Sequence, residues 1–276
     1  MLSALIIVFR EVLEAALVIG IVCAATRGVQ GRGLMVTLGV GAGIVGAVLV
    51  ALGAERIAEL AEGMGQELFN AAILLTVVIM LGAHILWMSR HGEALARDAS
   101  RAGESVRTGE KPPRILAALV GLAVLREGAE VVLFLYGIAA GGATVGAMFA
   151  GSAAGVVLGA LVGFALYSGL LTIPSRHLFA VSSALLILLA AGMAGQAAKF
   201  LIQADYLPPL SYLWDTSWLV ANDSALGQVL GTLVGYDAEP AGMQLLFYLA
   251  VIGVLVGGTW YVQRSRPRSG AAMTTV

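Results

Sequence analysis

The sequence has little charge and few of the residues that mark common catalytic or metal sites. Only 12% of its 276 residues are charged, against about 25% in a soluble domain. The single cysteine, Cys23, excludes an internal disulfide and any C-x-x-C motif. The three histidines, at positions 84, 91 and 177, form no zinc signature, and no G-x-x-x-x-G-K-[ST] phosphate loop is present. Disulfide scaffolds, zinc modules and ATPases are therefore disfavoured.

Apolar residues dominate instead and occur in long runs. They make up 59% of the chain, the mean hydropathy is +0.92, and 36 glycines suit close helix packing in lipid. Seven runs are long enough to cross a bilayer as helices. They cover residues 2–25, 33–54, 68–88, 115–140, 144–170, 178–200 and 243–262. We therefore predict an all-α integral membrane protein with seven transmembrane helices in a single domain, 1–276. Because the first run has no basic n-region and no cleavage site, we expect a retained helix.

Charge alternates between the connections of these runs. Arginines mark the first connection, the third (89–114), the fifth and the tail, whereas the segment 201–242 has acidic residues and no Lys or Arg. The positive-inside rule then predicts an inner (plasma) membrane protein with an extracytoplasmic N-terminus and a cytoplasmic C-terminus. Lys199 is an exception to the pattern. The Arg-rich segment 89–114 is interpreted as a cytoplasmic amphipathic loop near anionic lipid.

Two apolar runs contain the same charged motif. Arg-Glu-x-x-Glu occurs from Arg10 to Glu14 and again from Arg126 to Glu130, 116 residues later. Each charged side chain near the bilayer centre costs about 2.5–3.5 kcal/mol, so six unpaired ones would cost on the order of 15–20 kcal/mol. Charges that recur despite this free-energy cost indicate a function, and we interpret them as a cation pathway.

Other pairs extend the repeat. Gly39 and Gly43 in the second run correspond to Gly151 and Gly155 in the fifth, and a Leu-Phe pair followed by glycine occurs in the third and sixth. Three runs resemble the next three in order, so the second copy enters the membrane from the opposite side. This predicts an inverted repeat of residues 1–90 and 115–200. An extracytoplasmic loop (201–242) and a seventh helix (243–262) stand outside the repeat, and the glycines are expected to form packing faces.

On a helix, the glutamates of each motif share one face. An inverted repeat would bring the two motif helices together near mid-membrane, giving a site of net charge −2 if all groups are ionised. Carboxylates suit hard cations, so ferric iron fits well, while calcium, manganese and magnesium also match the ligand type. The site residues are the predicted ligands Glu11, Glu14, Glu127 and Glu130, with Arg10 and Arg126 as charge partners.

Two other interpretations stay open. The motifs could be structural ion pairs that fix helix register, but each has two acids for one base. The chain could instead be a membrane di-iron carboxylate enzyme, although such sites usually contain Glu-x-x-His. No copper, haem or flavin signature is present, so we expect no bound cofactor, with iron as the transported substrate.

The motifs in the first and fourth of seven spans resemble the oxidase-dependent iron transporter family, the high-affinity iron permeases of fungi and their bacterial relatives. The resemblance covers essentially the whole chain and implies a permease, not an enzyme, in which the motif glutamates carry iron. It further implies ferric iron delivered after oxidation by an extracytoplasmic partner, a copper oxidase or periplasmic haem and cupredoxin-like proteins. Most members read Arg-Glu-Gly-Leu/Ala-Glu, and the first motif departs from this with Val12. Some relatives are proposed to carry lead.

Three further features are candidates for function. Asp237 and Glu239 in the acidic loop resemble a metal-handling motif of fungal members and are interpreted as a metal relay, or as an ordinary solvated loop. His84, deep in the third span, is an additional ligand or a histidine hydrogen-bonded to a neighbour. Trp214 and Trp218 are expected to be interfacial anchors.

Overall fold

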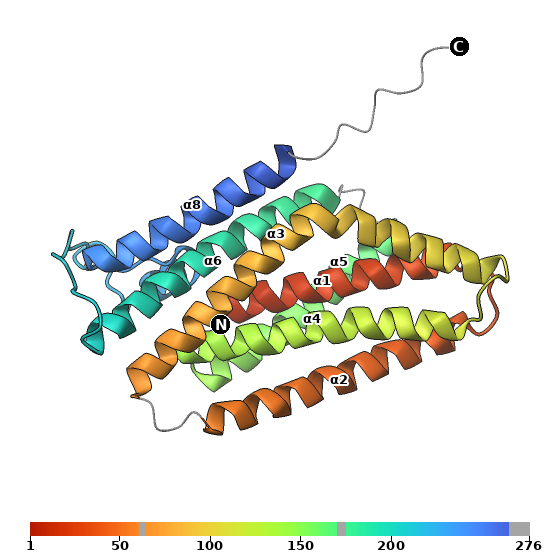
Figure 1. Ribbon diagram of the computed structural model, residues 1–276, viewed down its shortest axis with the longest axis horizontal. Helices are drawn as coiled ribbons and strands as arrows, with labels where there is room; N and C mark the ends of the chain where they lie inside the picture. The colour runs from red at the N-terminus through yellow and green to blue at the C-terminus, as the bar shows by residue number, and fades with distance from the viewer. Residues whose placement is uncertain (61–64, 170–174, 265–276) are drawn as a thin grey trace, which may run out of the picture.

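The computed structural model describes residues 1–60, 65–169 and 175–264. Within these ranges the regular secondary structure is helical, apart from one isolated β-bridge between Tyr212 and Ala241. The long helices lie side by side along one axis (Figure 1). In chain order the helices are α1 (Leu2–Ala25), α2 (Arg32–Leu60), α3 (Gln66–Arg107), α4 (Arg114–Ala140), α5 (Val145–Tyr167), α6 (Ser175–Gln203), α7 (Ala225–Val234) and α8 (Gly242–Arg264).

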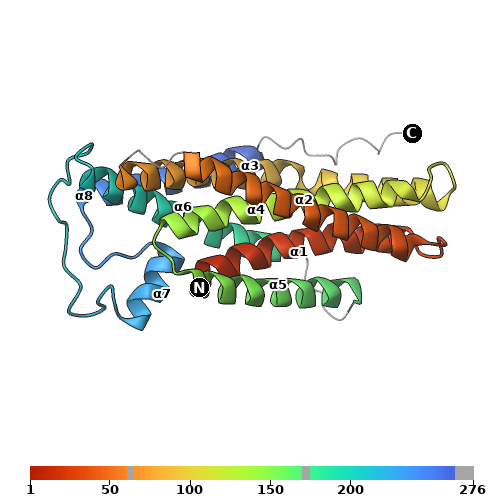
Figure 2. The ribbon, with the colours of Figure 1, turned by 90° about the horizontal axis from the view of Figure 1, so that it is seen from below.

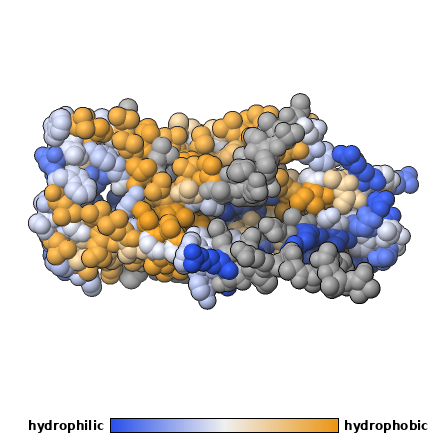
Figure 3. Space-filling model, turned by 90° about the horizontal axis from the view of Figure 1, so that it is seen from above, coloured by the Kyte–Doolittle hydropathy of each residue, from blue (hydrophilic) through white to orange (hydrophobic). Residues whose placement is uncertain are grey.

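Five of these helices contain a stretch long and apolar enough to cross a membrane. They lie at Arg32–Ala54, Gln66–His91, Val145–Tyr167, Ser183–Gln203 and Gly242–Val262. Large apolar side chains such as Val45, Phe149 and Val254 point outward from α2, α5 and α8. Apolar surface covers much of the bundle in Figure 3, and hydrophilic surface gathers at the end where α3 meets α4. The apolar part of the surface is suited to contact with lipid. The two motif helices, α1 and α4, each carry three charged residues within their apolar run.

The two motif helices pack against glycine faces. α1 lies along α5, and α4 lies along α2. A Cβ atom added at Gly155 would stand 2.8 Å from the Leu5 carbonyl oxygen, and one added at Gly39 would stand 2.6 Å from the Ala117 carbonyl oxygen. Because any side chain here would meet backbone, only glycine permits this approach. The prediction that these glycines form packing faces is confirmed.

The connections collect at the two ends of the bundle. The turns at 26–31 and 108–113 lie at one end, and α8 ends partway along the bundle in the direction of that end (Figure 1). Met1, the short turn at 141–144, the segment 204–241 and α7 lie at the other (Figure 2). The arginine-rich connections are thus separated from the acidic segment by the length of the helices.

The prediction of a loop over residues 89–114 was wrong, because α3 continues as a helix to Arg107. Ion pairs three residues apart, such as Glu104 with Arg107, support the exposed face of this extension. On its other face, Ala99 and Val106 are buried with Val22 of α1 and Leu116 of α4. The extension is thus amphipathic, as expected, but it is a helix, and its apolar stripe covers the ends of the motif helices.

The segment 201–242 contains a helix that the sequence analysis did not predict. α7 begins after Ser224, whose Oγ accepts a hydrogen bond from Gly227 N–H. It ends at Gly235, which adopts the left-handed conformation with φ of 69°. Both are common helix-boundary residues and were the available signal. The predicted end of the fifth span, at residue 170, lies outside the described residues.

Candidate cation site

The first motif is almost completely buried on α1. Arg10, Glu11 and Glu14 are 1%, 0% and 3% exposed. Arg10 Nη1 donates a hydrogen bond to Glu11 Oε1 at 3.0 Å, and its Nη2 lies 2.6 Å from Glu14 Oε1. One guanidinium therefore pairs with both acids, as the spacing along the helix allows. Glu11 Oε2 is nevertheless buried and receives no hydrogen bond from any described donor.

The second motif, on α4, is more open. Arg126 Nε donates to Glu130 Oε1 at 3.1 Å and lies 3.9 Å from Glu127 Oε1. The Arg126 side chain is 32% exposed, and its guanidinium stacks 4.0 Å from the ring centre of Trp87 on α3. Glu127 is buried, and its Oε2 receives no hydrogen bond from a described donor. The two motifs share a sequence but differ in burial and in their neighbours.

His84 of α3 lies between the motifs. Its imidazole is 6% exposed, its Nδ1 contacts Glu130 Oε2 of the second motif, and its Nε2 lies 3.9 Å from Glu14 Oε2 of the first. This second distance is too long for a hydrogen bond. Neither ring nitrogen makes a well-formed hydrogen bond with any residue in the described part of the chain, so Nδ1 meets Glu130 as a close contact only.

The structure brings the motif acids together in two overlapping groups. Glu11, Glu14 and His84 each offer one ligand atom within 4.8 Å of the others, and so do Glu11, Glu127 and Glu130. Glu11 belongs to both groups. We name these five side chains the carboxylate cluster. With four carboxylates and two guanidiniums and a neutral imidazole, the cluster and its arginines carry a net charge of −2. Buried carboxylate oxygens without donors can be stabilised by a bound cation.

An apolar layer separates the carboxylate cluster from one end of the bundle. Ile7, Leu81 and Phe134 are each 0% exposed and belong to one packed core. Each stands about one helical turn from a cluster residue on its own helix: α1, α3 and α4 respectively. We name these three residues the apolar barrier. Sequence reasoning missed them, because apolar residues in an apolar helix carry no distinguishing pattern.

Beyond the apolar barrier lies a cavity of about 830 Å³ at the end of the bundle that holds the segment 204–241. Ser3, Leu74 and Gly137 line it from α1, α3 and α4, and Gln196 and Lys199 line it from α6. Its size is within the range of small-molecule sites. The cavity and the carboxylate cluster thus lie on opposite sides of the apolar barrier.

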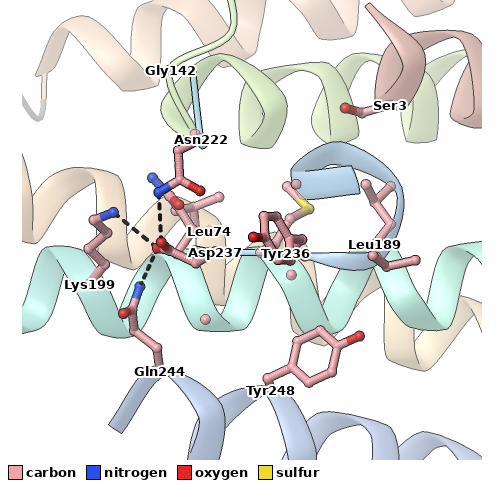
Figure 4. Close-up of a pocket in the computed structure, with 18 of the residues that line it drawn as sticks. Ser3, Leu74, Gly142, Leu189, Lys199, Asn222, Tyr236, Asp237, Gln244 and Tyr248 are labelled. Atoms are coloured by element: carbon pink, nitrogen blue, oxygen red, sulfur yellow. Dashed lines mark hydrogen bonds and ion pairs between the residues drawn. The ribbon is translucent and has the colours of Figure 1, made fainter. Parts of the chain in front are cut away.

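Asp237 fastens the loop to the helices around this cavity. Its Oδ1 accepts from Asn222 Nδ2 at 2.9 Å, and its Oδ2 accepts from Lys199 Nζ at 3.2 Å and Gln244 Nε2 at 3.4 Å (Figure 4). Lys199, which broke the charge pattern of the sequence, is therefore paired. Glu239 is exposed, and neither acid belongs to the ligand groups of the carboxylate cluster.

Burial raises the pKa of Asp237, but hydrogen bonds from Asn222 and Glu239 N–H and the Lys199 ammonium lower it by more, so the pKa lies below its ordinary value. The carboxylate form of Asp237 is the one that its neighbours stabilise.

Comparison with known proteins identifies the family. The iron permease FTR1 family matches residues 1–263 of the 276. The chain belongs to this family. Similar proteins include the ferrous iron permeases EfeU of Yersinia pestis and of Escherichia coli O6:H1, each 27% identical over 259 residues. These alignments cover 91% of this chain and 90% and 92% of the relatives. EfeU of Shigella sonnei is 26% identical over 258 residues. No solved structure matches the chain.

Membership in the iron permease family confirms the predicted class. The family and these relatives are permeases, which are transporters and not enzymes. Together with the apolar helices, it makes this chain a multi-pass inner membrane protein. One residue of the site, Trp87, was assigned no role from the sequence. Its contact with Arg126 depends on how α3 crosses α4, and no sequence pattern indicates that crossing.

Proposed function

We propose that this permease moves iron ions across the inner membrane through the carboxylate cluster between α1 and α4. The observation that carries the proposal is the shared position of Glu11. It joins its own motif to Glu127 and Glu130 within 4.8 Å, so acids from two helices face one place. Buried oxygens of Glu11 and Glu127 receive no hydrogen bond there from the part of the chain that the structure describes. Arg10 and Arg126 act as charge partners that offset part of the negative charge of the acids while the ion is absent.

The charge of the site bears on the form of iron. The ferric ion predicted from the sequence stays a prediction, supported by the four hard oxygen ligands. The net charge of −2 favours a divalent ion, which would leave the loaded site neutral. The relatives are named ferrous iron permeases. Ferrous iron is therefore the second candidate. Lead is disfavoured because soft ions prefer thiolates, and Cys23 is not among the ligand groups.

The proposed topology has seven spans, formed by all helices except α7. α1 and α4 have 24 and 27 residues, enough to cross a bilayer. The helix pairs support an inverted repeat of α1–α3 and α4–α6. Exchanging the two halves turns the α1–α5 pair into the α4–α2 pair and leaves α1–α4 and α3–α6 unchanged. The arginine-rich end would face the cytoplasm, so the N-terminus and the cavity would be extracytoplasmic.

In this topology the cavity is the entrance for iron. An oxidase or an iron-delivery protein would meet the segment 204–241 around it. Asp237 and Glu239 are proposed as a relay into the cavity, although Asp237 already accepts hydrogen bonds on both oxygens. The apolar barrier closes the way from the cavity to the cluster, so transport requires a second arrangement of the helices, as in rocking-repeat transporters.

Radio-iron uptake by cells expressing wild type, Glu14→Gln and Glu130→Gln tests the proposal. Membrane levels are matched, and iron is supplied as Fe²⁺ with ascorbate or as Fe³⁺ with citrate. We expect uptake to fall to background in both variants, with the Glu104→Gln control on the exposed part of α3 at the wild-type level. Normal uptake in either motif variant would contradict a shared path. The more rapidly transported form gives the oxidation state.

A further inference from the structure

His84 is held between the two motifs by contacts of different kinds. Its Nδ1 touches Glu130 Oε2, whereas its Nε2 lies 3.9 Å from Glu14 Oε2, and His84 belongs to one ligand group with Glu11 and Glu14. Neither nitrogen makes a well-formed hydrogen bond with a described residue. A histidine that binds metal usually donates its other N–H to a carboxylate, which fixes the tautomer and the ring orientation. In His84, Nδ1 lies against the Glu130 carboxylate as that donor would, and Nε2 faces Glu14 Oε2 at 3.9 Å, a distance that leaves room for an ion.

The second half of the chain offers no equivalent of this histidine. The Leu-Phe pairs at 68 and 178 and the glycines at 82 and 192 are 110 residues apart, which places Ala194 opposite His84. Ala194 is 0% exposed. In the same register Trp87, which stacks on Arg126, corresponds to Ala197. α3 also packs on both motif helices, whereas α6 has little contact with α1. At these two equivalent positions, α3 provides side chains that contact the motifs, whereas α6 provides only alanines.

We propose that His84 is a metal ligand of the transport site, binding the ion through Nε2 beside Glu11 and Glu14 while Glu130 orients its ring. The inference rests on the proposed function, because it makes the histidine of the same cluster a fifth ligand beside the four glutamates. Carboxylates alone serve Mg²⁺ and Ca²⁺ as well as iron, whereas imidazole nitrogen favours first-row transition metals. His84 thus gives the permease its preference for iron over the abundant hard divalent ions.

Pulsed EPR of Mn²⁺ bound to the purified full chain in nanodiscs tests this assignment without measuring transport. A directly bound imidazole gives a nitrogen modulation that changes when the protein is made with ¹⁵N-histidine. We expect this modulation in wild type and in the His91→Gln/His177→Gln double variant, where His84 is the only histidine left. In His84→Gln the modulation should be lost, and the ratio of Mn²⁺ to Ca²⁺ affinity should fall by about tenfold or more.

The possible outcomes test the His84 proposal and the transport-site proposal separately. If Mn²⁺ binding is lost in Glu14→Gln and Glu130→Gln but wild type shows no nitrogen modulation, His84 is not a ligand and the carboxylate cluster still stands. If Mn²⁺ does not bind wild type, or binds the two glutamate variants unchanged, the cluster itself is not the site and both proposals fail. Because the double variant keeps His84 intact, the test remains decisive even if His84→Gln does not fold.

Discussion

Arg10 Nη2 lies 2.6 Å from Glu14 Oε1, with both side chains at most 3% exposed. The equivalent pair in the second motif, Arg126 and Glu130, is 3.1 Å apart, but the Arg126 side chain is 32% exposed and rests on Trp87. The same five-residue motif thus forms a buried ion pair on α1 and a partly exposed ion pair on α4. The first arginine is expected to matter mainly for stability, and the second mainly for transport.

Replacing the two arginines separately should reveal this difference. In Arg10→Met, two buried carboxylates lose the one guanidinium that pairs with them among the described residues, and removing one partner of a buried ion pair costs about 3–5 kcal/mol. Arg126→Met removes a less buried partner, so its cost should be smaller than that of Arg10→Met. Thermal unfolding followed by fluorescence size-exclusion chromatography should show a large loss of stability for Arg10→Met alone. Arg10→Met/Glu14→Gln, with less unpaired charge, should recover part of it. Equal midpoints for the two single variants would contradict the asymmetry.

The general fold could be predicted because its determinants are local. The apolar run 2–25 has the same limits as α1, and the glycines at 39 and 155 already indicated close packing. The motif acids could be recognised as a site because charge in an apolar helix is costly and needs a partner. The expectation that the two motifs lie close together came from the inverted repeat, which itself stays a prediction.

The remaining features depend on contacts between distant segments. The extension of α3 to Arg107 is stabilised by burial of Val106 against α1 and α4, which its polar composition did not suggest. Whether His84 was a ligand or an ordinary core histidine depended on which helix faces it, and only the structure places it between Glu14 and Glu130. Lone residues carry no periodicity, so sequence patterns could not resolve these roles.

The glycine face of α2 gives a prediction with an internal control. A Cβ atom at Gly39 would lie 2.6 Å from the Ala117 carbonyl oxygen, whereas nothing lies within 4 Å of one at Gly41. Gly39→Ala should therefore push α2 from α4 and destabilise the protein by about 1–3 kcal/mol. Gly41→Ala should be neutral or stabilising by about 0.5–1 kcal/mol, because alanine favours a helix. Thermal midpoints of the purified variants give the comparison. A stable Gly39→Ala variant would mean that the helices are not in contact at this face.

Asp237 should hold the loop in a manner that is insensitive to pH near neutrality. Its pKa is lowered from 3.8, so the stabilisation is fully present above that ordinary value and is lost only as pH falls through the lowered pKa of the folded protein. Hydrogen exchange of residues 205–224, corrected for intrinsic rates, should thus show constant protection from about pH 8 to about pH 5. In Asp237→Asn these residues should lose protection throughout this range. Asp215 pairs only with Ser217 among the described residues, so Asp215→Asn should keep the wild-type protection. Protection that declines near pH 6 would point to a different group.

The apolar barrier predicts a sharp change in accessibility over one helical turn of α1. Ser3 lines the cavity, whereas Ile7, four residues further, is 0% exposed and stands before Glu11. Because Cys23 is the only cysteine, Cys23→Ser provides a background without thiols. In this background an anionic, membrane-impermeant methanethiosulfonate added outside spheroplasts should label Ser3→Cys and leave Ile7→Cys unlabelled until denaturant is added. Labelling of both at similar rates would show that the cluster is open to the cavity. Labelling of Ser3→Cys only in inside-out vesicles would place the cavity, and the N-terminus beside it, in the cytoplasm.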